Sequence, residues 1–132
     1  MIAVDTNLIV RLLAKDDLKQ TEQARGLMLN SKVYVTETVF LEAEWVLRHT
    51  YKFSRTDIVN GLRLFIRQSN VFMADIIAVD IALDWHEQGL DFADALHLAI
   101  SQHCTQFVTF DRKFARRSQH LNTIPVTLPN IP

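Results

Sequence analysis

Two aspartates come directly after short apolar runs. Asp5 follows residues 1–4 and Asp111 follows residues 107–110, and both runs have the character of strands. The carboxyl ends of parallel strands line the ligand crevice of an open α/β sheet. An acid at either position is therefore well placed for chemistry, although each could also serve only as turn and cap for the helix that follows it.

Two further acids lie in segments that predict helices. Glu42 shares a helix face with mostly apolar neighbours, whereas Glu44 precedes Arg48 by four residues, the order that favours a surface ion pair. A carboxylate on an apolar face is costly unless it is paired or binds metal, so capping and surface charge do not explain Glu42. Asp94 follows Asp91, a good N-cap, by three residues. It could serve the helix dipole, or offer an oxygen to a ligand.

Taken together, the four acids predict a site for a divalent cation. Clustered carboxylates raise one another's pKa, and a bound cation removes that conflict. Ligation by oxygen alone suits Mg²⁺ or Mn²⁺ rather than zinc. Such a site activates water and holds phosphate oxygens during phosphodiester hydrolysis. The candidate ligands and catalytic residues are Asp5, Glu42, Asp94 and Asp111.

The elements that must position these acids form an alternating pattern. Short apolar segments between amphipathic ones predict an α/β sandwich around a largely parallel sheet, with a buried first strand and Asn7 as the first N-cap. The expected strands are 1–4, 32–35, 70–75, 106–110 and 123–128. The expected helices are 7–14, 17–30, 36–50, 54–68, 75–87 and 91–103, with a short one after Asp111.

Composition limits the classes of function. The chain has 132 residues and a formal net charge of -1, which excludes strong non-specific attraction to nucleic acid through overall charge. A local basic cluster beside Asp111 is either a solvated face or an RNA contact. It consists of Arg112, Lys113, Arg116 and Arg117. The single cysteine, the lack of a signal-peptide pattern and the lack of an apolar run of ~20 residues predict a soluble cytoplasmic protein.

Four motifs resemble the PIN domain family and, more narrowly, VapC-type toxins of bacterial type II toxin–antitoxin systems. They are VDTN at 4–7, LEAEWVLR at 41–48, DFADALHLA at 91–99 and TFDRKF at 109–114. The resemblance covers essentially the whole chain, with the motifs in the family's order. It implies one three-layer α/β/α PIN-like domain over residues 1–132, with a mostly parallel central sheet of about four or five strands.

The resemblance also implies an activity and partners. Family members of this type are Mg²⁺- or Mn²⁺-dependent endoribonucleases that usually form dimers and are neutralised by a cognate antitoxin. The four acids carry over as the catalytic, metal-holding set, with Asp111 completing the site or helping a second ion to bind. The residues that would support them are Thr6, Asn7, Asp91 and Thr109.

Other interpretations stay open at this point. The chain could be a non-catalytic α/β binding module whose acids are caps and surface charges, but Glu42 argues against this. It could also be a related metal-dependent DNA nuclease or phosphatase. The aspartyl-phosphate type usually shows a DxD pattern, and position 7 is Asn7. RNA as substrate rests on the resemblance alone. His97, three residues after Asp94, either reaches the site or is structural.

Overall fold

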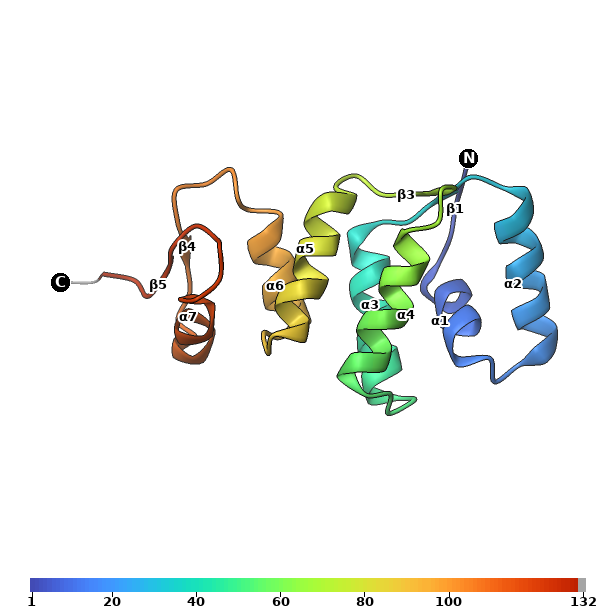
Figure 1. The fold of residues 1–132 in the computed structure, drawn as a ribbon, viewed down its shortest axis with the longest axis horizontal. Helices are drawn as coiled ribbons and strands as arrows, with labels where there is room; N and C mark the ends of the chain where they lie inside the picture. The colour runs from blue at the N-terminus through green and yellow to red at the C-terminus, as the bar shows by residue number, and fades with distance from the viewer. Residues whose placement is uncertain (131–132) are drawn as a thin grey trace. The chain divides into compact units, whose positions relative to one another are not determined.

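Short strands alternate with helices through residues 1–130, the part of the chain that the computed structural model describes (Figure 1). The chain divides into two compact units, Met1–Ile76 and the part from Ile77 onward, and each is described by itself. The α/β class predicted from the sequence is confirmed.

The first unit is built on a parallel three-stranded sheet of order β1-β2-β3. Ile2 is in register with Val33, and Val33 with Val71. Two helices connect each strand to the next, as parallel pairing requires. The elements are β1 (Ile2–Ala3), α1 (Thr6–Ala14), α2 (Leu18–Asn30), β2 (Val33–Tyr34), α3 (Glu37–His49), α4 (Arg55–Ile66) and β3 (Val71–Phe72).

The second unit contains a parallel pair of strands, β4 and β5, with Phe107 in register with Val126. The described strands therefore form sheets of three and two strands, and the expected single sheet of four or five is wrong. The three-layer arrangement stays a prediction. The elements are α5 (Ile76–Glu87), α6 (Phe92–Ala99), β4 (Phe107–Val108), α7 (Arg112–Ser118) and β5 (Val126–Thr127), with the first residue of α5 lying in the first unit.

Three local expectations need correction. β1 is exposed rather than buried: it lies at one edge of the three-stranded sheet, and Ile2 is 37% exposed. Helix α1 begins one residue before Asn7, and its N-cap is Asp5. The helix expected over 91–103 ends at Ala99, where Ile100 is the C-cap.

Each unit has its own apolar core. In the first, helix α1 packs against α2 and α3, and α3 packs against α4. Its most buried side chains include Ile9, Val33, Phe40, Leu47, Ile58 and Leu62. In the second unit they include Val79, Leu83, Phe92, Ala95 and Leu98. These side chains hold the helices that carry the candidate acids.

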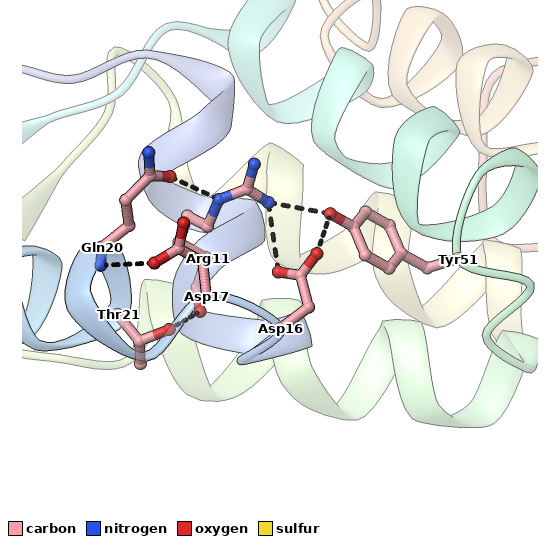
Figure 2. Close-up of polar contacts among 6 residues, drawn as sticks. All are labelled: Arg11, Asp16, Asp17, Gln20, Thr21 and Tyr51. Atoms are coloured by element: carbon pink, nitrogen blue, oxygen red, sulfur yellow. Dashed lines mark hydrogen bonds and ion pairs between the residues drawn. The ribbon is translucent and has the colours of Figure 1, made fainter.

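A polar network fixes the end of α1 against its neighbours (Figure 2). The Arg11 guanidinium donates to Gln20 Oε1 at 2.6 Å, to Tyr51 Oη at 2.8 Å and to Asp16 Oδ1 at 3.2 Å. Tyr51 in turn donates to Asp16 Oδ2 at 2.8 Å. Because these residues come from α1, α2 and the segments that follow α1 and α3, the network ties the end of α1 to its neighbours.

Over residues 1–130, the structure contains no helix long and apolar enough to cross a membrane.

Candidate metal site

Asp5 stands between β1 and α1 and uses one of its two carboxylate oxygens. It is the N-cap of α1, and its Oδ1 accepts a hydrogen bond from the Thr6 N–H at 2.6 Å. Its Oδ2 accepts none from the described part of the chain. Thr6 itself is 4% exposed, and within residues 1–130 its buried Oγ1 has no hydrogen-bond partner. Asp5 therefore has one oxygen without a hydrogen bond to the described chain, and the neighbouring Thr6 hydroxyl is buried there without a partner. Unsatisfied buried polar groups of this kind are explained by a bound ion or water.

The two glutamates of α3 lie in the opposite environments to those that the sequence predicts. Glu44, expected at the surface, is 1% exposed, and its carboxylate accepts hydrogen bonds from Arg48 at 2.8 and 3.1 Å. Glu42, expected on an apolar face, is exposed, as is Trp45 three residues on (52%). The reason is the position of the buried stripe of α3, which consists of Phe40, Ala43, Glu44 and Leu47.

Asp91 and Asp94 differ in their hydrogen bonding at the start of α6. Asp91 is the N-cap, and its Oδ1 accepts a hydrogen bond from the Asp94 N–H at 3.2 Å, as the spacing predicts. The Asp94 side chain is half-buried and makes no hydrogen bond within residues 1–130. Both of its oxygens are therefore available to a ligand.

The setting of Asp94 disfavours its charge. Burial raises the pKa of the Asp94 carboxyl, and the charges of Asp91 and Asp111 raise it further, while His97 lowers it. His97 is exposed, so it lies on the surface beside the acid rather than in the core. Its spacing of three residues from Asp94 was the sequence signal for this proximity.

Asp111 is held by hydrogen bonds at its backbone N–H and at its side chain. Its N–H donates to Thr109 Oγ1 at 3.0 Å, and Thr109 is itself tied to Thr127 O at 2.9 Å. As N-cap of α7, Asp111 accepts hydrogen bonds at Oδ1 from the N–H groups of Lys113 and Phe114, at 3.0 and 3.1 Å. Its Oδ2 accepts none from the described residues and remains open.

Each unit contains two of the candidate ligands. In the first, Asp5 caps α1 and Glu42 lies on α3, and these two helices are in contact. In the second, Asp94 and Asp111 are close enough for one charge to shift the pKa of the other acid. Among the described residues of either unit, no three His, Cys, Asp or Glu side chains form a group that could hold a metal ion. The donors are all carboxylate oxygens, the chemistry that Mg²⁺ and Mn²⁺ prefer.

Helix α7 displays the basic cluster predicted from the sequence. Arg112, Lys113, Arg116 and Arg117 are all exposed, whereas Phe114 between them is buried. The Arg117 side chain also donates to the carbonyl of Gly89 at 3.3 Å. The residue just before Asp111, Phe110, is 80% exposed, and charge and motif reasoning did not single it out.

A comparison with known families identifies one domain in the chain. The model of the PIN domain matches residues 2–119, which include all four candidate acids. No curated protein sequence matches the chain. PIN domains are generally nucleases that use divalent metal ions. The match covers most of the chain, and the protein belongs to the PIN domain family.

Proposed function

We propose that this PIN domain is a Mg²⁺- or Mn²⁺-dependent endoribonuclease and the toxin of a type II toxin–antitoxin module. The observation that carries the nuclease proposal is Asp94. It is a half-buried carboxylate with no hydrogen bond to the described chain, and like charges from Asp91 and Asp111 oppose its ionisation. A bound cation would compensate the charge of such a group.

The four candidate acids would hold the ion. Asp5, Glu42 and Asp94 would bind it, with Asp111 completing the set or helping a second ion to bind. When bound, the cation supplies an activated water and stabilises charge on the phosphate oxygens. Asp5 and Asp111 are oriented for this by their caps, since each fixes Oδ1 on a helix N-terminus and leaves Oδ2 open.

Supporting residues hold these acids in place. Asp91 caps α6 and so fixes the backbone of Asp94, and Thr109 fixes the backbone of Asp111. Thr6 brings a buried hydroxyl next to Asp5. Asn7 is exposed in the first turn of α1, on the same turn as Asp5. In this proposal all four act by orienting the ligands rather than by reacting.

RNA as the substrate is supported by the charge of α7. Its four exposed cations directly follow Asp111 and suit contact with phosphates, although the chain as a whole carries a net charge of -1. Contacts of this kind position a strand without reading its sequence. We therefore assign Arg112, Lys113, Arg116 and Arg117 to binding of the RNA backbone, and not to the choice of cleavage sequence.

The toxin role requires a surface for an antitoxin, and the first unit offers one. A hollow of about 460 Å³ lies between α1, α2 and α4. It includes the strongly exposed Leu29 (85%) and Leu64 (70%), with Lys15 and Arg25 also lining it. An apolar groove bordered by cations suits an amphipathic helix with acidic flanks. We assign it to the antitoxin, and we expect a cytoplasmic homodimer.

The antitoxin assignment is tested by neutralisation. The adjacent small reading frame, where it encodes a DNA-binding protein, supplies the candidate antitoxin for co-expression. Leu64→Glu should leave RNA cleavage intact because Leu64 lies at the surface, but it should abolish inhibition by the candidate. Equal inhibition of Leu64→Glu and wild type would contradict this docking surface.

The nuclease assignment is tested by RNA cleavage with Mg²⁺ or Mn²⁺, against EDTA. Asp94→Asn keeps the size of the side chain and removes its charge, so cleavage should fall at least about a hundredfold. Asp17→Asn is the matched control, because Asp17 caps α2 through Oδ1 and asparagine caps equally well. Identical preparation of all proteins controls for host nuclease. Equal cleavage by wild type and Asp94→Asn would refute the assignment, and cleavage of single-stranded DNA in preference to RNA would change the substrate.

A further inference from the structure

Phe110 is the most exposed aromatic side chain in residues 1–130. It is 80% exposed, against 52% for Trp45 and 40% for Phe72. The phenylalanines on either side of it in the sequence behave differently. Phe107 and Phe114 pack against each other with ring centroids 5.5 Å apart, and Phe114 is 4% exposed. The fold thus packs two of these three rings and leaves the middle one in solvent.

The backbone that carries Phe110 is fixed on both sides. The Thr109 N–H donates to Thr127 O at 2.9 Å, so the preceding residue extends the pairing of β4 with β5. The Asp111 N–H donates to Thr109 Oγ1, and the Asp111 carboxylate caps α7. An exposed ring on a fixed turn loses little freedom when it binds a flat partner.

The surroundings of the ring indicate what that partner is. Phe110 directly precedes Asp111, a candidate metal ligand, and α7 then presents Arg112, Lys113 and Arg116 to solvent. Cations that follow a phosphate backbone, combined with aromatic rings on which bases stack, are the means by which proteins bind single-stranded nucleic acid. Phe110 and the exposed Val108 two positions earlier form a narrow apolar surface beside these cations, whereas a protein partner would need a wider one.

We propose that Phe110 is a stacking platform for a base of single-stranded RNA, next to the phosphate contacts of α7. This rests on the proposed function, because RNA is taken there as the substrate. Stacking on Phe110 would fix one nucleotide beside Asp111 and so place the neighbouring phosphate near the candidate metal site. Because every base has a π-face, the platform positions the strand without selecting a sequence.

The test is the affinity for a short fluorescein-labelled single-stranded RNA, measured by anisotropy in EDTA so that binding is separated from metal-dependent cleavage. Phe110→Ala should weaken binding on the order of tenfold. Phe110→Leu should weaken it similarly, because it keeps an apolar side chain without a π-face. Phe110→Trp should bind at least as well as wild type. Val108→Ala is the matched control, since Val108 is a 50% exposed apolar residue two positions earlier, and its affinity should be unchanged.

Two results would overturn the platform. Equal RNA affinity of wild type, Phe110→Ala and Phe110→Leu would show that the ring does not stack on the strand. A lowered melting temperature of Phe110→Ala with unchanged RNA affinity would show that the ring is packed in the protein in solution.

The same variants separate this proposal from the proposed function. Binding that depends on Phe110 without any metal-dependent cleavage would support the platform and refute the ribonuclease. Metal-dependent cleavage together with an RNA affinity that does not depend on Phe110 would support the ribonuclease and refute the platform. Wild-type protein that binds no RNA at all would overturn both.

Discussion

Helix α3 in the first unit and the start of α6 in the second each carry two carboxylates, and they use them differently. In α3 the buried acid is Glu44, which is ion-paired with Arg48, while Glu42 is exposed and unpaired within the described chain. At the start of α6, Asp91 is exposed and caps the helix, while Asp94 is half-buried with no hydrogen bond to its side chain.

The difference shows that burial does not identify the acid available to a ligand. In α3 the more buried acid is the one with a structural partner, and in α6 it is the one without. What Glu42 and Asp94 share is that their carboxylates make no hydrogen bond or ion pair to residues 1–130. Asp5 and Asp111 each use Oδ1 to cap a helix and leave only Oδ2 for a metal, whereas Glu42 and Asp94 can offer both oxygens. The predictions below test this division.

The largest expected effect is a loss of RNA cleavage when Glu42 of α3 is replaced. Glu42→Gln should reduce metal-dependent RNA cleavage about a hundredfold or more, because it removes a ligand charge. It should change the free energy of unfolding by no more than about 0.5 kcal/mol, since Glu42 is exposed and unpaired. Cleavage rates and urea unfolding measure the two effects. Glu22→Gln, a second exposed helical glutamate, is the control and should change neither. Full activity of Glu42→Gln would remove Glu42 from the metal site.

The next effect is on stability in the same helix. Arg48→Met leaves the carboxylate of Glu44 buried without its partner and should lower the free energy of unfolding by about 3 kcal/mol. The value is at the lower end of the usual range because the Arg48 side chain is 38% exposed. Urea denaturation measures it, with Arg25→Met as an exposed control. A loss below about 1 kcal/mol would mean that Glu44 has no structural role beyond that of a surface acid.

A smaller effect concerns the cap of α6. Asp91→Ala removes the acceptor of the Asp94 N–H and should cost about 1 kcal/mol of stability. Asp91→Asn keeps an acceptor and should cost much less, although it removes the charge that helps to raise the pKa of Asp94. Thermal or urea unfolding of the two variants separates capping from charge. Equal losses in both would show that Asp91 acts through its charge and not as a cap.

The smallest expected effect is a gain in thermal stability when Asp94 is replaced by asparagine. Because the pKa of the Asp94 carboxyl is raised in the folded protein by burial and then by Asp91 and Asp111, its ionised form disfavours the fold at neutral pH. Asp94→Asn should therefore melt at a higher temperature than wild type in EDTA at pH 7.

That difference has a defined pH dependence. It should shrink as the pH falls through the raised pKa of folded Asp94, and it should vanish below the ordinary aspartate value, where folded and unfolded chains are both protonated. Melting curves from neutral to acid pH test this. A wild-type protein that is the more stable one at pH 7 in EDTA would show that ionised Asp94 has a structural partner.

The sequence predicted the order and type of the helices and strands because these depend on local patterns. The cap at Asp91 is where its spacing to Asp94 indicated. Sheet size was mispredicted, because pairing joins segments far apart in the chain, and no local pattern of β4 specifies which strand it pairs with. The settings of Glu42 and Glu44 were exchanged because apolar neighbours do not show which side of a helix faces the core.

The candidate site was predictable as a set of residue types and not as a geometry. Oxygen donors after strands and at helix starts indicated a hard divalent cation, and the PIN family match agrees with that chemistry. The unsatisfied hydroxyl of Thr6, the raised pKa of Asp94 and the exposure of Phe110 depend on packing, so they appear only in the folded structure.

The most direct measurement is an isothermal calorimetric titration of the protein with Mn²⁺, because it needs no knowledge of the RNA. Wild type should bind Mn²⁺, and Mg²⁺ should compete for the same site. Asp94→Asn and Glu42→Gln should each lose most of this affinity, while Glu22→Gln and Asp17→Asn should keep it. Unchanged Mn²⁺ binding by Asp94→Asn and Glu42→Gln would contradict the claim that Asp94 and Glu42 hold the metal.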